Sequence, residues 1–225
     1  MQKAPLWTLV IFFTGLLLAA CDSAPQETTP PTSISSGSPQ GVIVCMGDSL
    51  TAGYGLDESA AYPALLEARL KEEGFDYQVI NAGVSGETSS GALSRLNWML
   101  TLAPDIVILE TGGNDGLRGV DPALTRHNIE VIVDTLQNRQ IIVVLAGMQM
   151  VRNLGTGFTR AFNAIYPEIA QASDVILMPF FLEDVAARPH LNQADGIHPT
   201  AEGYRIITAN LYPYVLDAVK RHQER

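Results

Sequence analysis

Two short segments near opposite ends of the chain carry residue types that together could perform acyl transfer. Ser49 lies in a glycine-rich turn directly after the apolar run 42–46, where an exposed hydroxyl could act as a nucleophile. Asp195 precedes His198 by three residues across Gly196. That spacing lets the carboxylate reach Nδ1–H of the imidazole and leaves Nε2 free as a general base. Each segment alone has a second interpretation, because serine and aspartate commonly cap helix N-termini.

Two further polar segments contain groups that could stabilise a developing oxyanion. Asn114 lies in segment 110–115, after an apolar run, and its side-chain amide could donate a hydrogen bond to the oxyanion. Gly86 lies in segment 81–88, where a residue without a Cβ lets the backbone approach a substrate closely and offer its N–H. A turn would explain either segment taken singly. Together the four segments supply a nucleophile, a base, its orienting carboxylate and two oxyanion donors.

The elements that must position these residues follow an α/β pattern. Five nearly continuous apolar, β-branched runs indicate parallel strands that are covered on both faces: 42–46, 77–80, 106–109, 141–145 and 175–178. Helical patterns lie between and after them, at 62–73, 121–138, 158–171 and 200–221. We expect a three-layer α/β/α sandwich with a five-stranded parallel sheet of the flavodoxin-like type. In such sheets the site lies beyond the carboxyl ends of the strands, where all four polar segments would meet.

In their order along the chain, the four segments resemble the conserved blocks of the SGNH hydrolases, which are also called GDSL esterases. The matching residues are Gly47-Asp48-Ser49-Leu50, Gly86, Gly112-x-Asn114-Asp115 and Asp195-x-x-His198. The resemblance covers residues 42–213 and is greatest to the subgroup of periplasmic acyl-CoA thioesterase I, lysophospholipase and arylesterase. It implies that Ser49 is the nucleophile, His198 the base and Asp195 its partner. It also implies an oxyanion hole made of the N–H groups of Ser49 and Gly86 and the amide of Asn114.

The resemblance implies no metal and no cofactor, and it makes Asp48 structural. An ordinary α/β-hydrolase lipase is disfavoured, because the chain contains no G-x-S-x-G turn. One segment departs from the subgroup, whose members usually carry an aromatic residue after the fourth strand. Here the segment 150–157 has Leu154 at that place, followed by two glycines. The departure affects the expected acyl-chain preference and leaves the hydrolase prediction unchanged.

The N-terminus carries an export signal. The apolar run Leu6–Leu18 has only thirteen residues, whereas a membrane-spanning helix needs about 20. It ends in Leu18-Ala19-Ala20-Cys21, which resembles the lipobox of bacterial lipoproteins, in which the cysteine is acylated. A secretory signal with a chance cysteine is the alternative. We therefore expect a signal peptide at 1–20, a lipidated Cys21 with a disordered Pro/Ser/Thr tether at 21–40, and a hydrolase domain at 41–225.

Charge and the remaining titratable residues limit the classes of partner. The formal net charge is −10, with no cluster of Lys or Arg, so we expect no nucleic-acid binding. Cys45 lies within an apolar strand and is expected to be buried rather than catalytic. His127, His190 and His222 are expected to be solvated or structural.

We therefore expect a monomeric, exported, membrane-anchored serine hydrolase that faces the periplasm or the cell exterior. Its substrates would be small or medium acyl esters, lysophospholipids or acyl-thioesters, cleaved through an acyl-serine intermediate. Two alternatives remain. One is an O-deacetylase that acts on cell-envelope polysaccharide, and the other is a non-catalytic binding lipoprotein with the same fold. Asp22, directly after the cysteine, resembles the inner-membrane retention signal of enteric bacteria, although other bacteria sort by other rules.

Overall fold

A five-stranded parallel sheet organises the residues that the computed structural model describes, which are 38–150 and 154–225. Its strands are β1 (Gly41–Gly47), β2 (Tyr77–Gly83), β3 (Ile106–Glu110), β4 (Ile142–Ala146) and β5 (Ile176–Met178), in the spatial order β2-β1-β3-β4-β5. All four pairings are parallel. This is the strand order of the flavodoxin-like fold, so the predicted fold class is confirmed.

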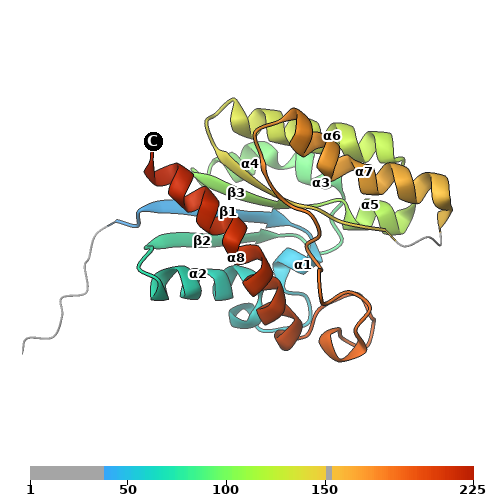
Figure 1. Cartoon of the computed structure of the whole chain (residues 1–225), viewed down its shortest axis with the longest axis horizontal. Coiled ribbons are helices and arrows are strands. Elements are labelled where there is room, and N and C mark those ends of the chain that lie inside the picture. The colour runs from blue at the N-terminus through green and yellow to red at the C-terminus, as the bar shows by residue number, and fades with distance from the viewer. Residues whose placement is uncertain (1–37, 151–153) are drawn as a thin grey trace, which may run out of the picture. The chain divides into compact units, whose positions relative to one another are not determined.

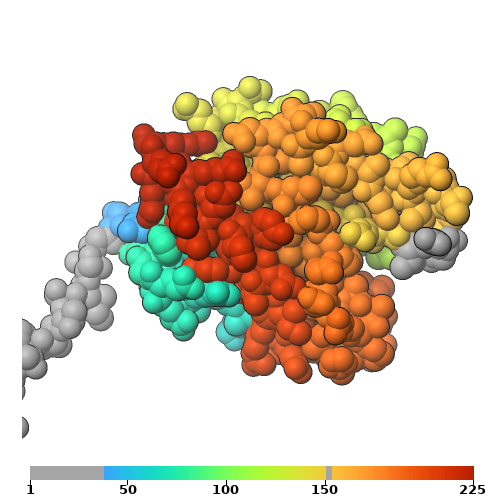
Figure 2. Space-filling model, viewed as in Figure 1, coloured from blue at the N-terminus to red at the C-terminus, as the bar shows by residue number. Residues whose placement is uncertain are grey.

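Helices cover both faces of the sheet, as parallel strands require. Figure 1 shows α6 and α7 on one side and α2 and α8 on the other. The long helices are α2 (Tyr62–Glu72), α6 (Pro122–Gln137), α7 (Thr156–Ala172) and α8 (Ala201–Gln223). Figure 2 shows α8, in red, packed beside the teal helix α2 on the face toward the viewer. These four helices are the four predicted from the sequence, with ends that differ by one or two residues.

Short helical elements in the connecting segments were not predicted. They are α1 (Ser49–Ala52), the 3₁₀ turn Glu58–Ala60, α3 (Ser89–Ser94), α4 (Leu96–Leu100), α5 (Gly113–Arg118) and the 3₁₀ turn Pro189–Leu191. A helix of four to six residues shows too few turns for an apolar periodicity to be visible in the sequence. Three of them, α1, α3 and α5, begin at or just after the polar segments of the site.

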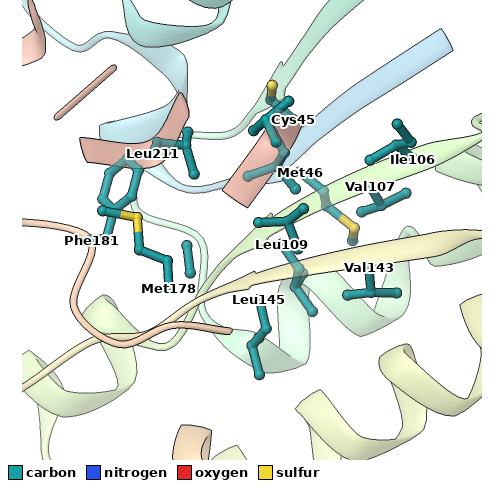
Figure 3. Packing of buried hydrophobic residues seen from close by; sticks show 14 of the residues in the cluster. Cys45, Met46, Ile106, Val107, Leu109, Val143, Leu145, Met178, Phe181 and Leu211 are labelled. Carbon is teal, nitrogen blue, oxygen red and sulfur yellow. The ribbon is translucent and has the colours of Figure 1, made fainter. Parts of the chain in front are cut away.

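The core lies between the sheet and its helices. Side chains of the central strands and of α8 fill it without exposure to solvent, including Met46, Leu109, Leu145 and Leu211 (Figure 3). Cys45 belongs to the same cluster and is a free cysteine, as expected. Burial raises the pKa of its thiol to about 12, so the thiol stays protonated and unreactive at neutral pH.

The predictions for the N-terminus fall largely outside the described residues. The signal peptide, Cys21 and most of the tether belong to residues 1–37, and the segment that departs from the subgroup includes 151–153. Residues Ser38–Arg225 form one compact unit. Among the helices in the described part of the chain, none is both long and apolar enough to cross a membrane.

Candidate active site

The turn from β1 into α1 presents Ser49 at the first residue of the helix. The preceding residue, Asp48, caps the helix, because its Oδ1 accepts a hydrogen bond of 2.9 Å from the backbone N–H of Leu50. Gly53 ends the helix in the left-handed conformation, with φ of +76°. Ser49 is therefore not the capping residue, and the capping interpretation of this serine is wrong.

The loop before α8 presents His198. Asp195 Oδ1 accepts hydrogen bonds from the backbone N–H groups of Ile197 (2.9 Å) and His198 (3.0 Å), which closes the turn around the imidazole. The cap of α8 is Thr200, whose hydroxyl accepts from Gly203 N–H. The capping interpretation of Asp195 is thus also wrong, and its carboxylate serves the histidine turn instead.

Ser49, His198 and Asp195 form one continuous hydrogen-bonded chain. His198 Nε2 lies 2.8 Å from Ser49 Oγ, and His198 Nδ1 lies 2.7 Å from Asp195 Oδ2. Because a carboxylate only accepts hydrogen bonds, Nδ1 carries the ring hydrogen and Nε2 presents its lone pair to the serine hydroxyl. The imidazole bond and the two backbone N–H groups lower the pKa of Asp195 to about 2. The three residues thus have the relative positions that nucleophilic catalysis requires.

Asn114 and Gly86 line the same pocket as Ser49 and His198. Asn114 Nδ2 donates one hydrogen to Asp48 Oδ2 at 2.9 Å, which leaves its second hydrogen for another acceptor. Gly86 has a φ of +79°, a conformation that favours glycine. Neither the Ser49 N–H nor the Gly86 N–H donates to another backbone group in the described chain. The sequence predicted this grouping at one end of the sheet, and the structure confirms the proximity of these residues.

The pocket encloses about 440 Å³ and is mainly apolar away from the polar cluster. Its apolar lining comes from four places in the sequence: Leu50 and Tyr54 after Ser49, Leu117 after Asn114, Met148 and Met150 after β4, and Leu182, Ala186, Ala187 and Ile197 from the long segment before α8. Leu117 and Ile197 are also among the large apolar side chains most exposed to solvent. An apolar groove that ends at a polar cluster suits a substrate with a hydrocarbon portion and one polar reacting group.

Several residues that support the site were not singled out by sequence reasoning. The ring of Tyr54 lies against the imidazole of His198, with centroids 4.6 Å apart. Gln193 Nε2 donates to Tyr54 O at 2.7 Å and to Pro199 O at 3.0 Å, so it joins the serine turn to the histidine loop.

A second buried network joins the two segments that carry Asn114 and Gly86. Asp115 accepts hydrogen bonds from the backbone N–H (2.7 Å) and the hydroxyl (2.5 Å) of Ser89. On the exposed side, Arg118 Nη2 donates to Gly86 O at 2.9 Å. These bonds hold α5 against the loop after β2, and so fix the distance between Asn114 and Gly86.

The other three histidines are not among the residues that line this pocket. His127 and His190 are exposed, and His222 contacts the Tyr77 hydroxyl at 2.7 Å and Asp105 at 3.4 Å. Within the described ranges, no group of three or more His, Cys, Asp or Glu side chains is arranged to hold a metal ion.

Comparison with known proteins places this geometry in a family. The model of the GDSL-like Lipase/Acylhydrolase family matches residues 45–206. Esterase TesA of Pseudomonas aeruginosa is 40% identical over 172 residues, which cover 76% of this chain and 86% of that protein. Thioesterase 1/protease 1/lysophospholipase L1 of Escherichia coli strain K12 is 39% identical over 166 residues, covering 73% and 78%. The crystal structure of AlinE4, an SGNH-hydrolase family esterase, is 45% identical, with a TM-score of 0.68 over 82% of this chain and 98% of that one. The chain therefore belongs to the GDSL-like lipase/acylhydrolase family and is a serine ester hydrolase.

Proposed function

We propose that this protein cleaves carboxylic esters and thioesters through an acyl intermediate on Ser49, with His198 as general base and Asp195 as the residue that orients it. The Ser49 Oγ attacks the substrate carbonyl carbon while its proton passes to His198 Nε2. The carbonyl electron pair moves to the oxygen, which the N–H groups of Ser49 and Gly86 and the amide of Asn114 stabilise. The bond to the leaving group then breaks, and His198 returns the proton to that group. Water hydrolyses the acyl-serine by the same steps.

One observation carries this proposal: a hydrogen-bonded chain runs from Ser49 Oγ through His198 to Asp195, with links of 2.8 and 2.7 Å, and Ser49 and His198 line an apolar pocket. A binding protein would have no need of a neutral imidazole held against a serine hydroxyl. The alternative of a non-catalytic lipoprotein is therefore disfavoured.

We propose acyl esters, lysophospholipids and acyl-thioesters as the substrate classes. The apolar lining formed by Leu117, Met148, Met150 and Leu182 supports a hydrocarbon acyl chain in the groove. The names of the relatives, which describe an esterase and a thioesterase 1/lysophospholipase L1, point the same way.

Hydrolysis of p-nitrophenyl esters from acetyl to palmitoyl tests this proposal. We expect kcat/KM to rise with chain length up to the limit of the pocket, because each added methylene buried contributes about 0.8 kcal/mol. The Ser49→Ala variant should lose at least about 10³-fold in kcat at unchanged folding. A strict preference for acetyl would favour the polysaccharide deacetylase, and activity equal to that of Ser49→Ala for every ester would contradict the enzyme proposal.

For location, we propose that the mature protein begins at a lipidated Cys21 and is held to a membrane, with the domain from residue 41 facing the periplasm or the cell exterior. The lipobox-like Leu18-Ala19-Ala20-Cys21 and the Pro-rich segment that follows it support this proposal. We further propose that the domain acts as a monomer, since Ser49, His198 and Asp195 of one chain complete the hydrogen-bonded triad without a second copy.

A further inference from the structure

Glu110 is a carboxylic acid with no solvent exposure at the end of β3, directly beneath the serine turn. Its Oε2 accepts hydrogen bonds from the backbone N–H of Asp48 at 3.2 Å and from the Thr51 hydroxyl at 2.9 Å. These two donors flank Ser49 in the sequence, so one carboxyl group holds both ends of the turn that presents the nucleophile.

Gly47 lies close against the carboxyl group of Glu110. A Cβ at Gly47 would lie 2.6 Å from Glu110 Oε2 and 2.1 Å from Thr51 Oγ1. Glycine at position 47 therefore lets the acid reach the serine turn. The Tyr62 hydroxyl lies 3.2 Å from Thr51 Oγ1 and closes the far side of the cluster.

A charge on Glu110 is poorly compensated. No cation contacts it, and its Oε1 has no hydrogen-bond partner in the described part of the chain. The Asp48 carboxyl, itself 2% exposed, lies within hydrogen-bond reach. Burial first, and the neighbouring Asp48 charge second, raise the pKa of Glu110 well above its ordinary range. Two adjacent carboxyl groups in such a site hold one proton between them.

Asp48 is the better site for the single remaining charge. Its Oδ1 accepts from Leu50 N–H and its Oδ2 accepts from the Asn114 amide, both at 2.9 Å. A neutral Glu110 therefore leaves an ionised Asp48 that holds the α1 N-terminus and the amide of Asn114. Through these bonds, the position of Glu110 sets the relative positions of Ser49 and Asn114.

We propose that Glu110 is a positioning residue for the reaction: it fixes the serine turn by accepting from Asp48 N–H and Thr51 Oγ–H, and it aligns the oxyanion donor Asn114 through Asp48. This inference rests on the proposed function of Ser49 and Asn114. By this inference, a buried group that never contacts the substrate affects kcat through Ser49 and Asn114.

Two substitutions of similar length separate positioning from simple filling of space. Glu110→Gln keeps an acceptor oxygen and is neutral at every pH, whereas Glu110→Met fills the same volume without an acceptor. We expect the Gln variant to retain kcat within about threefold of wild type. We expect the Met variant to lose at least about 30-fold in kcat, with KM changed by less than about threefold. Misalignment of Ser49 and Asn114 reduces stabilisation of the transition state but leaves substrate binding unchanged. Asp105→Asn, the same type of change at the opposite end of β3, is the matched control and should leave kcat unchanged.

Stability against pH tests the neutral state independently. Unfolded Glu110 ionises above its ordinary pKa, whereas the folded pair keeps its proton, so the wild type loses stability as pH rises between the ordinary and the raised pKa. The Gln variant has no such proton. Its melting temperature should therefore exceed that of the wild type by a margin that grows from pH 5 to pH 8. This comparison tests the protonation state of Glu110 even if the Met variant fails to fold.

The outcomes distinguish this inference from the proposed function. Equal kcat for the Gln and Met variants, whether both stay active or both are impaired, overturns the positioning role while Ser49→Ala remains inactive. A margin in melting temperature that stays flat or shrinks with pH overturns the neutral state. Activity in Ser49→Ala would instead remove the acyl-serine mechanism itself.

Discussion

Removal of the Asn114 side chain tests whether its amide stabilises the transition state. Asn114 lines the pocket, and its Nδ2 donates one hydrogen to Asp48 Oδ2 at 2.9 Å. The other amide hydrogen therefore points away from the carboxylate. Loss of one preorganised oxyanion donor costs about 10²–10³-fold in kcat, or about 2.7–4 kcal/mol. We expect Asn114→Ala to lose activity in this range with little change in KM, because the ground-state carbonyl gains little from that donor.

The substitution also has a stability cost that must be kept separate. Asp48 would lose one hydrogen bond to a charged acceptor, worth about 1.5–3 kcal/mol, while its bond from Leu50 N–H remains. The kinetics with p-nitrophenyl butyrate should therefore be measured well below the melting temperature of the variant. Asn210→Ala removes an amide that donates to Glu183 O, and since neither residue lines the pocket, this variant serves as the matched control. A kcat loss of less than about tenfold in Asn114→Ala, or a loss that falls mainly on KM, would refute the assignment.

Two further predictions concern pH and location. Because its hydrogen bonds hold the pKa of Asp195 at about 2, this carboxylate stays ionised in the folded protein down to about that pH. Its contribution to stability is lost as pH falls from the ordinary aspartate pKa through that value. Asp195 should thus add no ionisation to the acid limb of kcat/KM above pH ~4, and a slope of two in that range would contradict this. For location, Cys21→Ala should move the protein from the membrane fraction to the soluble fraction, and the wild-type N-terminal peptide should carry acyl mass. A variant that stays membrane-bound, or a wild type without that mass, would show that the segment is an ordinary signal peptide.

The long elements could be predicted because their signals are local and repeated. The strands at 42–46 and 106–109 are continuous apolar runs, and the structure buries β3 completely. Asp121-Pro122 predicts the N-terminus of the helix at 121–138, and Asp121 does cap α6 by accepting from Ala123 N–H. In each case the burial and the cap follow from residues adjacent in the sequence.

The site was predictable for a different reason. Once the strands are parallel, the segments that follow them must meet at one sheet edge, so Ser49, Asn114 and Gly86 come together without any knowledge of side-chain geometry. The supporting contacts could not be found in this way. Gln193 reaches Tyr54 across 139 positions, and Glu110 reaches Thr51 across 59. Such pairs depend on tertiary packing, and nothing in the local sequence marks either partner.

Glu110 illustrates that limit most clearly. A glutamate at the end of an apolar strand is usually expected at the surface, yet this one is completely buried. The nearby Gly47 explains why, since only glycine leaves room for the carboxyl group. The requirement is visible only when the two strand ends lie side by side.

Trapping of the covalent intermediate tests the central claim most directly. The enzyme is mixed with a p-nitrophenyl acyl ester, quenched in acid within the first turnovers, digested and analysed by mass spectrometry, in parallel with the Ser49→Ala variant. We predict one acyl group per chain, located on the peptide that contains Ser49 and absent from the variant. An acyl group on another residue, such as the pocket-lining Ser85, or sustained hydrolysis by Ser49→Ala would contradict the acyl-Ser49 mechanism.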